Sequence, residues 1–229
     1  MRASPARAKP RQSCPRLSFA RVEAPLPIAV LVSGTGTNLQ ALLDTVHSRE
    51  AEIVAVAANV ADAPALERAR ARGVPTAVFA AAEHPSREQR DRALADWLLE
   101  RGARLVVLAG YMELIGDAFL SRFPRAVINV HPSLLPAFPG LHAVEQALAY
   151  GVKVFGVTVH FVDSGIDTGP VIAQRAVELP HARTPDEVLS VLHPIEHELL
   201  ARAVRLFAQA ALETDPENPR RIVAAPSAG

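Results

Sequence analysis

The chain has 229 residues, 49% of them hydrophobic, and its formal net charge is zero. This length and composition can supply the core of one large α/β domain or two small ones. Zero net charge argues weakly against nucleic acid or an anionic membrane as the main partner. No apolar run approaches the roughly 18 residues of a membrane span. The one cysteine, Cys14, cannot form an internal disulfide, which fits a reducing compartment such as the cytoplasm.

Residues 1–25 differ from the rest of the chain in composition. They contain many arginines, interspersed prolines and serines, and a single acidic residue, Glu23. Two interpretations stay open: an organelle transit peptide, which is rich in Arg and poor in acidic residues, and a disordered extension. We expect the disordered extension.

From Pro27 onward, short apolar segments alternate with segments whose apolar residues recur at helical spacing. This alternation predicts an α/β fold with a doubly wound, mostly parallel sheet and helices on both faces. The predicted helices are Asn38–His47, Ala65–Arg72 and the segment that Ser86 caps and that runs to Glu100. The predicted strands are Ile28–Ser33, Ile53–Ala58, Val74–Phe79, Leu105–Ala109 and Val127–Val130.

The pattern changes after residue 151. Val154–Val162 and Val171–Val177 alternate around a Gly-rich loop, which predicts longer strands at the far edge of the sheet. Thr184-Pro185-Asp186-Glu187 is a capping box, so a final helix begins there. Pro194 should kink or split this helix, because an interior proline costs about 3 kcal/mol. The residues after Thr214 are expected to form a loose tail.

The turn between the first strand and the first helix reads Ser33-Gly34-Thr35-Gly36-Thr37-Asn38. Its glycines let the backbone approach a ligand, and a helix N-terminus offers free amides to an anion. A dinucleotide fingerprint needs a third glycine three positions after Gly36, where this chain has Leu39, so NAD is not expected. A tight turn without any ligand would explain the same residues.

Polar residues mark the end of the strand Val127–Val130. Because side chains alternate along a strand, Asn129 and His131 should lie on the same face, and Pro132 prevents the strand from continuing. Open α/β sheets place their active sites at such carboxyl ends of strands. A carboxylate such as Asp167 beside the imidazole would stabilise its protonated form.

These segments resemble the motifs of the folate-dependent formyltransferases, and the resemblance runs from about Pro27 to about Phe207. The motifs are Asn129-x-His131-Pro132-Ser133-Leu134-Leu135-Pro136, Pro139-Gly140-Leu141-His142 and His160-Phe161-Val162-Asp163-x-x-x-Asp167-x-Gly169-Pro170.

The resemblance implies an activity and a domain organisation. The expected reaction moves the formyl group of 10-formyltetrahydrofolate to the amine of glycinamide ribonucleotide in purine biosynthesis. We expect a formyltransferase domain over residues 26–212 with a C-terminal tail over 213–229, in a cytoplasmic monomer or homodimer. No metal, nucleic acid or membrane partner is expected.

The resemblance also implies roles for individual residues. Asn129 and a protonated His131 would donate hydrogen bonds to the formyl oxygen as negative charge develops there. Asp167 would hold His131 charged and relay a proton through a water molecule. On the ribonucleotide side, the matching residues are Gly36, Thr37, Asn38 and Glu196.

The cofactor pocket is expected to contain Arg87, the segment Met112-Glu113-Leu114-Ile115, and Asn129. Backbone groups in that segment would bind the pterin edge while apolar side chains hold its faces. Glu113 departs from the family, which usually has a basic residue there, so weaker binding of the folate glutamate tail is expected.

Other readings of the same residues stay open. A methionyl-tRNA formyltransferase would carry a further C-terminal domain, and formyltetrahydrofolate deformylase an N-terminal regulatory domain; neither is expected here. Sugar-nucleotide formyltransferases are harder to exclude, although Pro139-Gly140-Leu141-His142 and Glu196 favour the purine substrate. A nucleotide-binding module without catalysis would explain the glycine loop but not the Asn/His/Asp trio.

The segment His193-Pro194-Ile195-Glu196-His197 spells H-x-x-E-H, an inverted zinc-protease motif. That motif needs both histidines on one regular helical face, and Pro194 disturbs the turn between them, so zinc is not expected. In the family reading, His193 stands where Gln or Lys is common, and its contribution to phosphate binding stays open. His142 is expected only to open a helix through Ala149.

Overall fold

The computed structural model describes residues 24–224. The expectations for residues 1–23, including Cys14 and the choice between a transit peptide and a disordered extension, concern a part of the chain outside this range.

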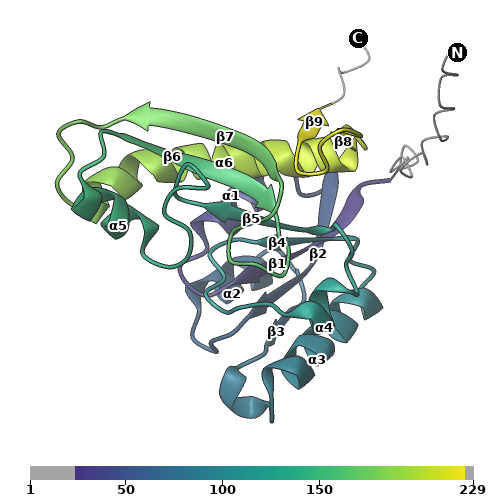
Figure 1. Ribbon diagram of the computed structural model, residues 1–229. Helices are drawn as coiled ribbons and strands as arrows, with labels where there is room; N and C mark the ends of the chain where they lie inside the picture. The colour runs from purple at the N-terminus through teal and green to yellow at the C-terminus, as the bar shows by residue number, and fades with distance from the viewer. Residues whose placement is uncertain (1–23, 225–229) are drawn as a thin grey trace, which may run out of the picture.

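A seven-stranded sheet with the order β3-β2-β1-β4-β5-β6-β7 forms the centre of the molecule (Figure 1). The strands from β3 to β5 run parallel, whereas β6 and β7 are antiparallel to their neighbours. The mostly parallel sheet and its longer edge strands are therefore confirmed. The strands are β1 (Leu26–Val32), β2 (Ala51–Ala58), β3 (Thr76–Val78), β4 (Leu105–Leu108), β5 (Val127–His131), β6 (Val154–Phe161) and β7 (Val171–Glu178).

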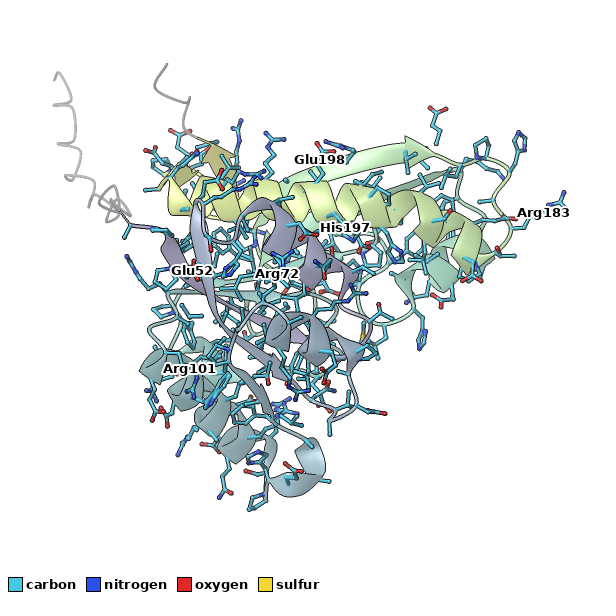
Figure 2. The ribbon with its side chains drawn as sticks, turned by 180° about the vertical axis from the view of Figure 1, so that it is seen from behind. Glu52, Arg72, Arg101, Arg183, His197 and Glu198 are labelled. Atoms are coloured by element: carbon cyan, nitrogen blue, oxygen red, sulfur yellow. The ribbon has the colours of Figure 1, made fainter. Side chains whose placement is uncertain are left out.

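Helices cover both faces of the sheet, as predicted. One face carries α1 (Thr37–Thr45), α2 (Pro64–Arg70), α5 (Ala143–Tyr150) and α6 (Pro185–Ala208), and Figure 2 shows α6 and α1 from that side. The other face carries α3 (Arg87–Glu100) and the short α4 (Asp117–Leu120). A 3-10 turn, η1 (Ala81–Glu83), precedes α3.

The sheet separates two apolar cores because successive strand residues point to opposite faces. In β1, Ile28 and Val30 join the core beneath α1 and α6, whereas Ala29 and Leu31 join the core beneath α3. Each of these four residues is fully buried. The strand is therefore apolar throughout, as expected for a parallel strand that is covered on both sides.

The start of α6 agrees with the sequence, but its interior does not. The Thr184 side chain accepts from the backbone N–H of Glu187, whose side chain accepts in turn from the backbone N–H of Thr184, so the capping box is confirmed. Of the two effects predicted for Pro194, a kink or a split, the split is wrong, because α6 continues through the proline to Ala208. Buried residues such as Leu192 and Leu199 attach the helix to the sheet on both sides of the proline.

The chain after α6 is more ordered than expected. Instead of a loose tail after Thr214, two short strands form an antiparallel hairpin, β8 (Leu212–Thr214) and β9 (Ile222–Ala224). Leu212 is buried and Ile222 packs on the larger core, which gives the hairpin an apolar anchor. Between residues 24 and 224, no helix is long and apolar enough to cross a membrane.

Candidate active site

A cavity of about 340 Å³ opens at the carboxyl ends of β4 and β5. This is the edge of the sheet at which the sequence placed the polar residues. Four chain segments, 108–115, 129–132, 140–143 and 160–167, supply its lining residues. The predicted residues Met112, Glu113, Leu114, Ile115, Asn129, His131 and Asp167 are all among them.

Asn129, His131 and Asp167 converge in this cavity. Asp167, which lies in the loop between β6 and β7, places its Oδ2 atom 3.4 Å from Nδ1 of His131. Its other oxygen, Oδ1, accepts from the amide of Asn129 at 3.3 Å. The carboxylate thus contacts both residues of β5, and the side chains are near enough to act on one reacting group.

His160 is a further member of this cluster that the sequence analysis did not single out. It lies directly opposite Asn129 in the antiparallel pairing of β5 with β6, and its side chain is buried. Nδ1 faces the Phe161 carbonyl at 2.7 Å and therefore carries a hydrogen, and Nε2 lies 3.2 Å from the amide nitrogen of Asn129. Nε2 is also 3.5 Å from Asp167. His160 belongs to the motif quoted above, but only the strand register shows where it points.

The surroundings of Asp167 determine its charge. Burial alone would raise the pKa of this carboxyl, but hydrogen bonds from His160 and the backbone of Gly140, together with the positive charge of nearby imidazoles, lower the pKa to about 2. Asp167 is therefore ionised at neutral pH. Its side chain is only 13% exposed, so water screens the charge weakly.

His131 is held between two oxygen acceptors. Its Nε2 atom is 2.8 Å from the Phe138 carbonyl, so this nitrogen carries a hydrogen, and its Nδ1 atom faces Asp167. Phe138 has a φ of 52°, in the left-handed region. The arrangement suits a doubly protonated ring, since each N–H then has a partner.

The loop that carries Asp167 is braced internally. Asp163 Oδ1 accepts from the backbone of Gly165 and from the Thr168 hydroxyl, at 3.1 and 2.6 Å. Asp167 itself has a φ of 52°. A Cβ at Gly169 would lie 1.7 Å from the Phe161 carbonyl oxygen, so only glycine permits this approach. These motif residues shape the loop and so aim Asp167 at His131.

A second polar cluster lies between α1 and α6. Asn38, the second residue of α1, donates to Glu196 of α6 at 2.9 Å, and both side chains are buried. Within the described residues, the Asn38 Oδ1 atom has no hydrogen-bond partner. Burial raises the pKa of Glu196, although Asn38 and the nearby imidazoles of His193 and His131 oppose this. The interaction with His131 indicates that this cluster adjoins the catalytic candidates.

The glycine loop has a packing role as well. Gly36 adopts a φ of 75°, and a Cβ there would lie 2.5 Å from that of Ala65 in α2. Thr37 then begins α1. The requirement for glycine at position 36 therefore follows from the fold alone, and ligand binding is not needed to explain it.

The H-x-x-E-H segment is not arranged as a metal site. Glu196 is paired with Asn38, and burial together with His193 lowers the pKa of His197, which Figure 2 labels on α6. Across residues 24–224, no three His, Cys, Asp or Glu side chains are grouped so that they could hold a metal ion.

Of the residues expected around the cofactor, all except Arg87 line the cavity. Met112 and Leu114 are 62% and 56% exposed and form an apolar rim of the cavity. Arg87 does not line the cavity; it is exposed in the first turn of α3, close to Gly116. Glu113 is not a free carboxylate, because it accepts from the buried Arg90 at 2.7 Å.

Residues 26–204 match the family model described as formyl transferase. The chain is similar to the phosphoribosylglycinamide formyltransferase of Mycobacterium tuberculosis, with 44% identity over 81% of this chain and 86% of the relative. It is also 40% identical, over 85% of its length, to the trifunctional purine biosynthetic protein adenosine-3 of Drosophila pseudoobscura pseudoobscura, of which it spans 15%. The solved structure of glycinamide ribonucleotide transformylase 1 from Symbiobacterium toebii matches with a TM-score of 0.84 and 44% identity, covering 88% of this chain and 95% of that one.

Proposed function

The chain belongs to the formyl transferase family, and on that premise we propose that it transfers a formyl group from 10-formyltetrahydrofolate to the amine of glycinamide ribonucleotide. The product is formylglycinamide ribonucleotide, an intermediate of purine biosynthesis. One observation carries this proposal: Asn129, His131 and Asp167 meet at one cavity in a chain that resembles enzymes of this name over most of its length.

The chemistry assigns a task to each member of the trio. The substrate amine attacks the formyl carbon, a C–N bond forms, and negative charge develops on the formyl oxygen. Asn129 and a protonated His131 donate to that oxygen and stabilise the tetrahedral intermediate. As the intermediate collapses, the bond to the folate nitrogen breaks. Asp167, acting through a water molecule, passes the proton of the attacking amine to the leaving nitrogen.

The contacts of His131 add one requirement to this mechanism. Its Nε2–H is donated to the Phe138 carbonyl, and its other nitrogen faces Asp167. A formyl oxygen that binds to Nε2–H therefore has to replace the Phe138 carbonyl as the acceptor. Asn129 would have to turn its amide from Asp167 or His160 in the same way. Substrate binding would thus exchange internal hydrogen bonds for bonds to the transition state.

The ribonucleotide fits the cluster between α1 and α6. The backbone amides of Gly36 and Thr37, at the start of α1, would bind the phosphate. The Asn38 oxygen, which has no partner among residues 24–224, offers an acceptor for the glycinamide group, and Glu196 offers a carboxylate for the ribose hydroxyls.

The folate fits the cavity at the end of β4 and β5. Its volume of about 340 Å³ lies within the range of small-molecule pockets. The exposed side chains of Met112, Leu114, Leu141 and Ile166 provide an apolar rim for the ring system. The proposed steps need no metal, because hydrogen-bond donors and a carboxylate handle the charge and the proton. We also propose that the reaction takes place in the cytoplasm, because the single cysteine fits a reducing compartment.

A comparison of three acceptors in separate reactions tests this function. The purified protein is incubated with 10-formyltetrahydrofolate and one of three acceptors: glycinamide ribonucleotide, water alone, or charged initiator tRNA. Tetrahydrofolate should be released at a high rate only with glycinamide ribonucleotide, together with the formylated product. Release at the same rate with water alone would identify a hydrolase and refute the proposal.

A further inference from the structure

Arg90 is a buried cation that the mechanism above does not use. It lies on α3, directly behind the segment 110–116 that forms one wall of the cavity, and it is only 1% exposed. We propose that Arg90 is a positioning residue that holds this wall in place and thereby sets the affinity for the folate substrate. This inference rests on the proposed function for the identity of the ligand.

The hydrogen bonds of Arg90 converge on this wall. Its Nη2 atom donates to the backbone carbonyl of Leu114 at 2.9 Å, and its Nη1 atom donates to the Glu113 carboxylate at 2.7 Å. The neighbouring Asp91 accepts from Arg90 at 3.0 Å and from the backbone N–H of Gly116 at 2.8 Å. The Arg90–Asp91 pair therefore holds three positions of the segment at once.

Tyr111 and Ile115 anchor the wall on the core beneath α3, but the exposed rim between and beside them has few other attachments. The side chains of Met112 and Leu114 are more than half exposed, so apolar burial contributes little to their placement. Apart from the Arg90–Asp91 pair, the Ser33 hydroxyl accepts from the backbone of Met112 at 2.8 Å. The position of the apolar rim therefore depends largely on polar contacts, and Arg90 makes two of them.

An arginine is needed here for a geometric reason. The planar guanidinium directs separate N–H groups at Leu114, Glu113 and Asp91, whereas a lysine ammonium is a single point of charge. Removing the guanidinium would leave the buried Asp91 without its cationic partner and the Leu114 carbonyl without its donor. The segment would then sample positions in which the rim no longer fits the ligand.

The test compares Arg90→Met and Arg90→Lys with Arg92→Met as a matched control. Arg92 is also on α3, but it pairs with Glu88 at the surface, where both side chains are 63% exposed. Initial rates give kcat and the two KM values. Calorimetric titration with tetrahydrofolate gives a Kd that does not depend on turnover, and thermal unfolding reports on folding.

In Arg90→Met, the KM for 10-formyltetrahydrofolate and the Kd for tetrahydrofolate should both rise by about tenfold or more, as expected when a charge-assisted hydrogen bond is lost. The KM for glycinamide ribonucleotide and kcat should stay within about twofold, since the trio lies on β5 and the 163–170 loop. Arg90→Lys should recover only part of the folate affinity, and Arg92→Met should behave as the wild type.

Two outcomes would overturn the inference: an unchanged folate KM in Arg90→Met, or a parallel loss in both KM values and kcat. If Arg90→Met does not fold, Glu113→Gln weakens one of the contacts by removing its negative charge and should raise the folate KM by about two- to threefold. An unchanged folate KM in that variant would also overturn it. A wild type that binds tetrahydrofolate but does not formylate glycinamide ribonucleotide would instead refute the proposed function.

Discussion

Replacing Asp167 with asparagine keeps the shape of the side chain and removes its charge. The remaining oxygen can still accept from the Gly140 backbone N–H, which donates to Oδ2 at 2.7 Å. The new amide nitrogen then faces the amide of Asn129, 3.3 Å from Oδ1, so that two donors meet. His131, 3.4 Å away, loses its anionic neighbour. The variant therefore disturbs the charge on His131 and the orientation of Asn129 together.

The size of the effect follows from these contacts. At an effective dielectric constant of about 20, two unit charges about 4 Å apart interact by about 4 kcal/mol before desolvation is subtracted. If about 3 kcal/mol of this is lost in the transition state, the rate falls by about 10². We therefore expect kcat to drop by at least about 10²-fold. The pH optimum for turnover should move to lower pH, because less of the protonated His131 donor is present at neutral pH.

The same substitution changes the dependence of stability on pH. The folded-state pKa of Asp167 is about 2, below its ordinary value of 3.8, so the carboxylate stabilises the fold above pH 3.8 and this contribution is lost as the pH falls towards 2. The difference corresponds to about 2 kcal/mol. Asp167→Asn should therefore be less stable than the wild type at neutral pH, and the gap should narrow below about pH 4.

Urea unfolding from pH 2 to 7 and pH–rate profiles with saturating substrates measure both effects. Substrate dissociation constants should change far less than kcat, because Asp167 is assigned to the transition state. A variant with wild-type turnover and an unmoved pH–rate profile would remove Asp167 from the mechanism. A stability gap that stays constant down to pH 2 would contradict the electrostatic account of this carboxylate.

Asn129→Ala should lower kcat by about 10² to 10³, the usual loss for one oxyanion donor, while circular dichroism stays native; an unfolded variant would make Asn129 structural instead. Gly169→Ala should destabilise the fold by about 2 kcal/mol or more in urea unfolding, because its Cβ would lie 1.7 Å from the Phe161 carbonyl oxygen; wild-type stability would show that the loop yields easily. Treatment with EDTA should leave activity unchanged. Activity that disappears and returns with Zn²⁺ would reinstate His193, Glu196 and His197 as ligands.

Local patterns in the sequence were enough to predict the general architecture and to place two polar residues at the end of a strand, whereas their catalytic roles followed from the family resemblance. The apolar segments that became β1, β2 and β4 are continuous because both faces of these strands are covered, and this can be read without knowing what covers them. The capping box at Thr184 is equally local. Asn129 and His131 could be placed at the end of a strand because alternation and the following proline act over a few residues.

The pairings between distant segments were decided only by the tertiary structure. His160 reaches Asp167 because β6 pairs antiparallel with β5 in one register, and a shift of one residue would turn its side chain to the other face. Glu113, which the family resemblance placed in the cofactor pocket, is bound to Arg90 of α3. Pro194 is tolerated because α6 is packed on the sheet on both sides of it. Local propensity describes how a segment prefers to fold by itself, whereas these contacts depend on what the rest of the chain places beside it.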